Sequence, residues 1–344
     1  MIKRLISTFF VGLIAFMAMA QSQTANTLRY FLKNGKTYDI RMSELSQLKN
    51  IANVSIKNMF KDTSKPSKDF LNADIDSVVL VYVDYPDTIP SGNINKNTNP
   101  KALLLEYPKL REGSDQLLVI HSTQELGITY SLEWDCTKKS QRWTCFEMHN
   151  GLPDNNVGRS GSFREDPDIP SKYRTTLSQY SGSGFSRGHM CASSDRQTTI
   201  EQNSQTFYLS NMHPQYQNHN GNLWQALETQ VQSWDKTNFR DTLYVVKGGT
   251  IDKSDQILTT TSSGLLVPKY FFMAILCVKN GAYKAVAFWT EHTNTAIKKA
   301  KPKDYAISID ELEQKTGIDF FCNLPDDIEN AVEKSYTPAD WGWQ

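Results

Sequence analysis

The chain has 344 residues, too many for one typical domain and enough for a catalytic domain with a smaller partner. Its 37 basic residues balance 37 acidic ones, which excludes a strong overall field that would attract polyanions. The 39% of hydrophobic and 22% of charged residues are typical of a globular protein. Any binding of nucleic acid must therefore depend on local basic groups.

The N-terminal residues 1–20 have the pattern of a secretory signal peptide. Lys3 and Arg4 precede an apolar run over residues 5–16, and small residues in an A-x-A arrangement end at Ala20. The apolar run is short for a membrane span, and an uncleaved anchor is the alternative interpretation. We therefore expect a secreted or periplasmic protein without a membrane span.

Residues 21–86 indicate a small β-rich accessory module. Two alternating stretches meet at Asn34 and Gly35, the dipeptide that most favours a tight hairpin turn, and "DIDSVVLVYVDY" follows as a further strand. Residues 87–102 are dense in Pro, Asn, Gly and Ser without an apolar period, which is typical of a linker. We place the main domain at residues 103–344, and the sequence does not reveal the partner of the accessory module.

The five cysteines lack the spacing of a zinc site or of a disulfide scaffold. Cys136 and Cys145 flank the polar turn "TKKSQ" between two strand-like stretches, so a bridge across this hairpin and a pair of free thiols are both open. Cys191 lies two residues beyond His189, where it is either a nucleophile or, the interpretation we favour, a small buried residue.

The main domain combines strands and helices without a regular alternation. Strand-like runs occupy residues 116–122, 142–150, 206–211, 242–249, 270–278 and 283–290. Because a βαβ rhythm is missing, we expect an α+β fold with a mainly antiparallel sheet and flanking helices.

A polar, glycine-rich block around His189 is the first candidate for chemistry. Gly182 and Gly184 precede Arg187 and Gly188 in a setting that is poor core material. An imidazole there can take a proton from water while the guanidinium holds a phosphate oxygen. A lone Arg-Gly-His is more often part of a loop, so this block needs support from elsewhere.

A predicted helix over residues 222–234 provides that support. Asn220 and Glu228 border its buried face about two turns apart. An Asn carbonyl and a carboxylate suit a hard cation that keeps most of its waters, and magnesium fits best. The alternatives are a helix N-cap for Asn220 and a solvated side chain for Glu228. The apolar stripe of this helix consists of Leu223, Trp224, Leu227, Val231 and Trp234.

At these residues the chain resembles the DNA/RNA nonspecific endonucleases, the ββα-metal family that includes secreted bacterial nucleases and mitochondrial endonuclease G. The signature of that family is a D-R-G-H box, then N-x-x-P-Q, an Asn, a Trp four residues later, and L-E. Similar blocks extend over residues 125–325. The chain matches the signature at Arg187, Gly188, His189, Asn211, Pro214, Gln215, Asn220, Trp224, Leu227 and Glu228.

The resemblance implies a ββα-metal finger and a role for each matched side chain. His189 would be the general base that activates water, and Asn220 the direct ligand of Mg²⁺, for which Mn²⁺ is a substitute. Glu228 would orient a water molecule in the shell of the ion. Asn211 would support the histidine and the geometry of the site.

The resemblance also implies two phosphate-binding arginines. Arg187 would contact the phosphate, and Arg159 would be an additional arginine that acts in the transition state, although Arg164 lies close enough in sequence to compete for that match. One departure is plain, because Ser186 stands where the family usually has Asp. This change removes a negative charge near His189, and we still expect activity because the groups in direct contact with metal and water remain.

The expected substrates are DNA and RNA. Contacts to backbone phosphates read neither the base nor the sugar, so we expect hydrolysis without sequence specificity. Two rival hypotheses are a noncatalytic nucleic-acid-binding or surface module that retains the fold, and a phosphodiesterase that acts on another substrate.

Overall fold

The computed structural model describes five stretches of the chain: residues 27–32, 37–41, 75–81, 93–150 and 156–343. The chain divides into two compact units, residues 1–89 and residues 90–344. The expected signal peptide, residues 1–20, lies outside the described residues. None of the helices in the described part combines the length and the apolar character needed to cross a membrane.

The first unit contains a three-stranded antiparallel sheet. Strand β1 (Thr27–Leu32) lies between β2 (Thr37–Arg41) and β3 (Ile75–Val81). Phe31 pairs with Thr37, which is the register of a hairpin, while the expected turn at residues 33–36 lies outside the described residues. The β-rich character that we expected for this part of the chain is present in its described strands.

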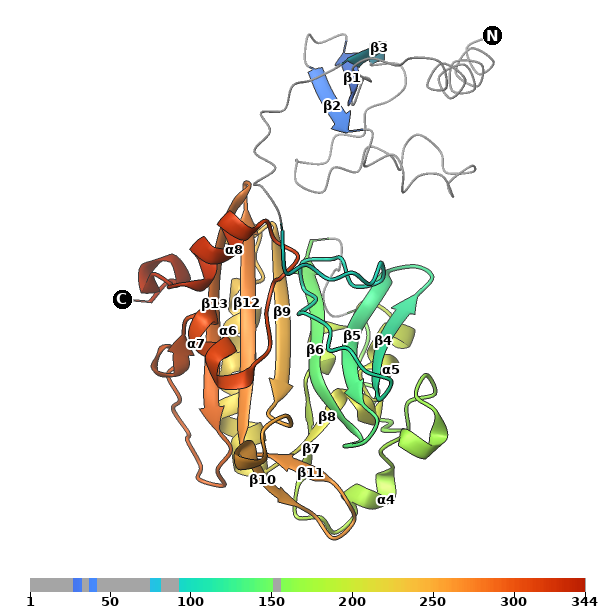
Figure 1. Cartoon of the computed structure of the whole chain (residues 1–344), viewed down its shortest axis with the longest axis vertical. Helices are drawn as coiled ribbons and strands as arrows, with labels where there is room; N and C mark the ends of the chain where they lie inside the picture. The colour runs from blue at the N-terminus through green and yellow to red at the C-terminus, as the bar shows by residue number, and fades with distance from the viewer. Residues whose placement is uncertain (1–26, 33–36, 42–74, 82–92, 151–155, 344) are drawn as a thin grey trace. The chain divides into compact units, whose positions relative to one another are not determined.

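The second unit is built on a seven-stranded antiparallel sheet (Figure 1). The prediction of an α+β fold with a mainly antiparallel sheet is confirmed. Central strands such as β12 are buried on both faces, which explains their unbroken apolar runs. The order across the sheet is β14 (Ala306–Ile307), β13 (Ala282–Glu291), β12 (Tyr270–Lys279), β9 (Thr242–Gly249), β6 (Ser140–His149), β5 (Gly127–Asp135) and β4 (Gln116–Thr123).

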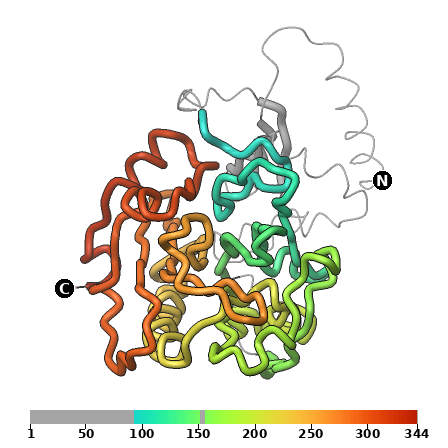
Figure 2. Tube along the Cα trace, turned by 60° about the horizontal axis from the view of Figure 1, so that its bottom comes forward, coloured from blue at the N-terminus to red at the C-terminus, as the bar shows by residue number. Residues whose placement is uncertain are grey.

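Each face of this sheet carries its own hydrophobic core. Along β6, Phe146 enters one core and Cys145 enters the other, because side chains alternate across a strand. The predicted helix over residues 222–234 corresponds in its larger part to α6 (Gln225–Trp234). All five residues of its predicted apolar stripe lie in the first core. The second core holds α7 (Ile309–Thr316) and α8 (Asp326–Glu333). Figure 2 shows the C-terminal segment beside β13, the strand that precedes it.

Residues 93–102 belong to the second unit and pack against the rest of it, whereas the sequence indicated a linker over 87–102. Asn93 donates hydrogen bonds to the carbonyls of Cys322 and Leu324 at 2.8 and 2.5 Å. Asn97 is buried and donates to the carbonyl of Pro108 at 3.0 Å. The asparagines that suggested an unstructured segment instead bind backbone carbonyls of the second unit.

Of the two alternatives left open for Cys136 and Cys145, the structure has the pair of free thiols. Cys145 pairs with Ser131 on β5, five residues before Cys136, which corresponds to about 16 Å along a strand. A disulfide needs Cα atoms within about 7 Å. The two cysteines also belong to different cores, on opposite faces of the sheet. Cys191 is buried, and burial raises the pKa of its thiol to about 12, which favours the packing role.

One predicted strand, residues 206–211, is a turn. It follows α5 (Ile200–Gln205), and the hydroxyl of Thr206 donates to the carbonyl of Asn203 at 2.7 Å. A helical turn over Leu209–Asn211 comes next, and a strand begins only at Met212. Side-chain bonds to the local backbone compete here with strand pairing.

Candidate active site

Two short strands and the helix that follows them form the centre of the candidate site. Strand β7 (Ser186–His189) pairs antiparallel with β8 (Met212–Gln215). A π-helical turn, His219–Trp224, leads into α6. Glycine is required at position 188, because any Cβ there would clash with the side chain of Gln215. This arrangement is the ββα element that the family resemblance implied.

The helical turn contacts both ends of β7. The Nδ2 atom of Asn220 donates to Oγ of Ser186 at 3.4 Å, and Nε1 of Trp224 donates to the carbonyl of His189 at 3.2 Å. Side chains alternate along β7, so Arg187 and His189 share one face of the strand and Ser186 lies on the other. Asn220 therefore contacts the first residue of β7, and His189 is the last residue of the same strand.

His189 is buried, with 9% of its surface exposed. Its ring packs against Phe163 and Phe207, with centroid distances of 5.6 and 5.1 Å, and its Nε2 atom has no hydrogen-bond partner among the described residues. Burial lowers the pKa of His189 to about 3, and the positive charges of Arg159, Lys247 and Arg187 add to the effect. The imidazole is neutral at physiological pH and can accept a proton.

Asn211 holds the backbone that follows His189. Its Oδ1 atom accepts from the amide of Cys191 at 2.8 Å, and its Nδ2 atom donates to the carbonyl of Cys191 at 2.8 Å and to that of Thr206 at 2.9 Å. Its own carbonyl accepts from the amide of Met190 at 3.0 Å. Because Asn211 is completely buried, these bonds face no competition from water.

Asn220 is not a helix N-cap, since its amide already donates to the carbonyl of Tyr216 at 2.9 Å inside the helical turn. Its side chain is therefore available for another role. The bond from Nδ2 to Ser186 leaves the carbonyl oxygen Oδ1 as the atom for a cation, and Ser186 Oγ in turn donates to the carbonyl of Gln215 at 2.9 Å. An oriented amide oxygen is a ligand that suits a hard divalent ion.

Glu228 is not a solvated side chain, because its carboxylate pairs with a buried lysine. Lys247 on β9 is fully buried, and its Nζ atom lies 3.2 Å from Oε1 of Glu228 and 3.8 Å from Oδ2 of Asp195. Burial opposes the charge of Lys247, but the two carboxylates outweigh it and raise the lysine pKa. Burial raises the pKa of Glu228, and Lys247 opposes that rise.

Lys247 and Asp195 are site residues that sequence analysis missed. The available signal was a lysine within the apolar run "LYVVKGG", in phase with Val245, which belongs to the first core. A charged residue at an inward position of a buried strand needs a partner of opposite charge. The sequence could have indicated that such a partner exists, but not which one.

The three candidate arginines stack on aromatic rings. Arg187 lies over Phe163 at 4.1 Å and Arg159 over Phe207 at 4.9 Å, so both rest on rings that contact His189. Arg164 lies over Tyr208 at 4.3 Å. Of the two arginines that competed for the second phosphate role, Arg159 is the one whose charge acts on His189 and on Glu228.

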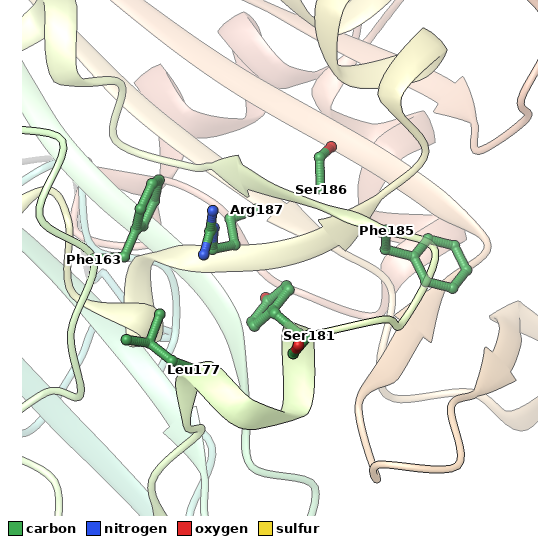
Figure 3. Close-up of a pocket in the computed structure, with 7 residues that line it drawn as sticks. Phe163, Leu177, Ser181, Phe185, Ser186 and Arg187 are labelled. Atoms are coloured by element: carbon green, nitrogen blue, oxygen red, sulfur yellow. The ribbon is translucent and has the colours of Figure 1, made fainter.

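A cavity of about 410 Å³ opens beside Arg187. In Figure 3 the guanidinium of Arg187 lies next to the ring of Phe163 at one end of the cavity, and Phe185 lies at the other. A wall of aromatic rings with one cation suits a ligand that has a flat face and a negative charge. The lining residues are Phe163, Leu177, Tyr180, Ser181, Phe185, Ser186 and Arg187.

Comparison with known proteins gives consistent matches. A family model described as DNA/RNA non-specific endonuclease matches residues 122–327. A protein named "Nuclease" from Nostoc sp. is 31% identical over 216 residues, which cover 59% of this chain and 75% of the relative. Nuclease C1 from Cunninghamella echinulata is 36% identical over 172 residues, 47% of this chain and 67% of that protein.

A solved structure shares the fold. It is titled a crystal structure of the EndoG/EndoGI complex, and the match has a TM-score of 0.52 at 23% sequence identity. The match covers 62% of this chain and 89% of the solved chain. At this level of identity, the likeness concerns the fold alone.

Proposed function

Because this chain belongs to the DNA/RNA non-specific endonuclease family, we propose that it cleaves DNA and RNA at internal bonds, with His189 as the general base. Members of this family are nucleases, so the reaction class is hydrolysis of phosphodiester bonds. The observation that carries the assignment of the base is the state of His189: it is buried and neutral, its Nε2 has no partner among the described residues, and Asn211 holds the backbone that follows it.

The proton transfer in this proposal uses the neutral imidazole. His189 accepts a proton from the attacking water, a step that contributes about 10²- to 10⁴-fold to the rate in general base catalysis. Burial keeps the imidazole unprotonated before substrate binds, and the positive charges of Arg159, Lys247 and Arg187 lower its pKa further. A bound phosphate would offset these charges and make the imidazole a stronger base at the moment when it is needed.

The proposed cofactor is Mg²⁺ held by Asn220, with Mn²⁺ as a substitute. When bound, the ion supplies positive charge that stabilises the phosphoryl oxygens and the leaving 3′ oxygen. Ser186 orients the amide of Asn220, and the carboxylate of Glu228 would orient a water molecule in the shell of the ion. Lys247 fixes the position of that carboxylate.

The proposed substrate contacts involve phosphate and ring faces. Arg187 and Arg159 bind phosphate oxygens, and the cavity beside Arg187 receives the adjoining sugar and base. Stacking on aromatic rings tolerates any base, and phosphate contacts do not depend on the sugar. Both features support cleavage without sequence specificity on DNA as well as RNA.

We also infer export to the periplasm or the medium. The support is the basic start and apolar run of residues 1–20. Detection of the chain in those fractions, with an N-terminus that begins near Gln21, would test this inference.

The central experiment uses covalently closed plasmid, circular single-stranded DNA and RNA with the purified protein in Mg²⁺. Circles have no ends, so their cleavage identifies an endonuclease. We expect all three substrates to be degraded, activity to stop in chelator, and His189→Ala to lower the rate at least about a hundredfold. His149→Ala is the matched control, because His149 lies outside the candidate site.

Three outcomes would contradict the proposal. Salt-sensitive binding of all substrates without cleavage, in both Mg²⁺ and Mn²⁺, would favour a noncatalytic binding module. Cleavage of small phosphodiesters but not of nucleic acids would favour a different substrate. Full activity of His189→Ala would reject the assigned base.

A further inference from the structure

A second group of acidic side chains lies between α7 and α8, where the proposed reaction does not use it. Asp310 and Glu313 belong to α7, and Glu333 is the last residue of α8. One carboxylate oxygen from each lies within 4.8 Å of the other two. These helices cover the sheet face of the second core, whereas His189 and the α6 stripe lie at the first.

Glu333 in this group is buried, and one of its carboxylate oxygens has no hydrogen-bond donor among the described residues. Only 5% of its surface is exposed, and its Oε1 atom has no hydrogen-bond partner among the described residues. A buried carboxylate oxygen without a donor costs free energy that a folded protein normally avoids. Glu333 contributes one carboxylate oxygen to the cluster, and the carboxylates of Asp310 and Glu313 cannot donate a hydrogen bond to it when they are ionised.

The surroundings supply more negative charge. The groups that act most strongly on Glu333 after burial are the carboxylates of Glu313, Glu329, Asp319 and Asp310, and together these effects raise the pKa of Glu333 to about 10. Burial likewise raises the pKa of Glu313 to about 8, with Asp319 and Asp310 adding to the rise. A cation placed among these oxygens would remove both the repulsion and the uncompensated burial.

We propose that Asp310, Glu313 and Glu333 bind a calcium ion that ties α7 to α8. Calcium takes oxygen ligands at about 2.4 Å, so two ligands on opposite sides of the ion are about 4.8 Å apart. The three carboxylate oxygens all lie within 4.8 Å of one another, so one ion of this size can contact all three. Asp310 and Glu313 are only partly buried, which leaves room for water to complete the coordination shell.

Calcium fits this group better than magnesium does. Magnesium requires ligands at about 2.0 to 2.1 Å in near-octahedral geometry and usually binds through only one or two carboxylates. Three carboxylates from two helices match the larger number of charged ligands that calcium accepts. The ion would therefore stabilise the fold of the second unit and would not take part in phosphodiester cleavage.

The test measures thermal unfolding of the full chain carrying Asn220→Ala. This substitution removes the proposed catalytic metal ligand, so that a metal ion bound there does not contribute to the result. All seven tryptophans lie in residues 90–344, so their fluorescence reports on the second unit alone. After treatment with chelator, we expect 10 mM Ca²⁺ to raise the unfolding temperature by at least about 3 °C and the same concentration of Mg²⁺ to raise it less.

Two variants separate binding from misfolding. Glu333→Gln and Glu313→Gln should lose the Ca²⁺-dependent rise, and in chelator each should be at least as stable as the parent, because each removes a repelled carboxylate. Glu311→Gln is the matched control on the same helix, since Glu311 is exposed and pairs with Lys315 at 3.4 Å, and it should keep the rise.

No rise in the parent protein would overturn the proposal, as would an equal rise in Glu333→Gln and Glu313→Gln. An equal effect of Mg²⁺ and Ca²⁺ would overturn the assignment of calcium. None of these outcomes depends on nuclease activity, so they leave the proposed reaction to its own test.

Discussion

Nζ of Lys247 lies 3.2 Å from Oε1 of Glu228, and the lysine is completely buried. This ion pair joins a central strand of the sheet to the helix that carries the proposed water-orienting carboxylate. Asp195 contacts the same lysine from the other side at 3.8 Å. Loss of the lysine would therefore affect both the fold and the charge around His189.

Replacement of Lys247 by methionine should destabilise the second unit. Two buried or nearly buried carboxylates would remain without their cation, and removal of one partner of a buried ion pair typically costs about 3–5 kcal/mol. Denaturant unfolding followed by tryptophan fluorescence measures the change. The double variant Lys247→Met/Glu228→Gln should recover part of the loss, because it removes an uncompensated charge.

Lys299→Met is the control for this prediction, since Lys299 is exposed at the surface. It should change the unfolding free energy by less than about 0.5 kcal/mol. A Lys247→Met protein as stable as the parent would show that the ion pair contributes nothing.

The acid limit of activity should lie below the ordinary histidine pKa of 6.5. The base works when it is unprotonated, and burial together with three positive charges lowers the pKa of His189 to about 3. Activity should therefore persist as the pH falls through 6 and decline only at more acidic values. The measurement is the pH profile of kcat/KM in saturating Mg²⁺, with circular dichroism at each pH to confirm that the protein stays folded.

The same profile should shift in Arg187→Met. Removal of a positive charge raises the histidine pKa, so the acid limb should move to higher pH. An acid limb that remains at the same pH in this variant would mean that another group controls it.

Changes at Ser186 should alter the Mg²⁺ requirement. Ser186→Asp places a negative charge beside Asn220, and we expect the Mg²⁺ concentration for half-maximal activity to fall about tenfold or more. Ser186→Ala removes the acceptor for Asn220 Nδ2 and frees the amide to rotate, so it should raise that concentration. The measurement is the cleavage rate against Mg²⁺ concentration at fixed substrate.

The KM for nucleic acid should change little in the alanine variant, because Ser186 acts through Asn220. Equal Mg²⁺ curves for the parent and both variants would argue against Asn220 as the ligand.

Asn211→Ala should reduce kcat as well as stability. It removes three side-chain hydrogen bonds from a fully buried site, at about 1–3 kcal/mol for each group left unsatisfied, and it frees the backbone next to His189. Paired measurements of unfolding free energy and of kcat at a temperature where the variant is folded check both effects.

Asn97→Ala is the matched control for this loss. Asn97 is a buried asparagine whose amide nitrogen and oxygen are both bonded, to the carbonyl of Pro108 and the amide of Leu110, and it packs near the second core. We expect a comparable loss of stability and an unchanged kcat. Equal loss of kcat in both variants would mean that Asn211 acts only through stability.

The sequence by itself determined the local parts of this protein. The apolar period of residues 223–234 predicted a helix with a buried stripe, and the family resemblance carried by Arg187, His189, Asn211 and Asn220 implied the ββα element. The helical stripe depends on side chains three or four residues apart, where the helical period acts directly. The sequence left a bridge between Cys136 and Cys145 open because strand register, not nearness in sequence, decides which residues face each other.

Only the tertiary structure decided which charges surround the imidazole and which carboxylates lack a cation. Lys247 reaches Glu228 because β9 lies in the sheet beneath α6, and Glu333 meets Glu313 because two helices cover the opposite face. The packing of strands and helices that are far apart in the sequence determines these contacts, and no local pattern of residues encodes them. The partner of a buried charge is therefore a property of the folded chain.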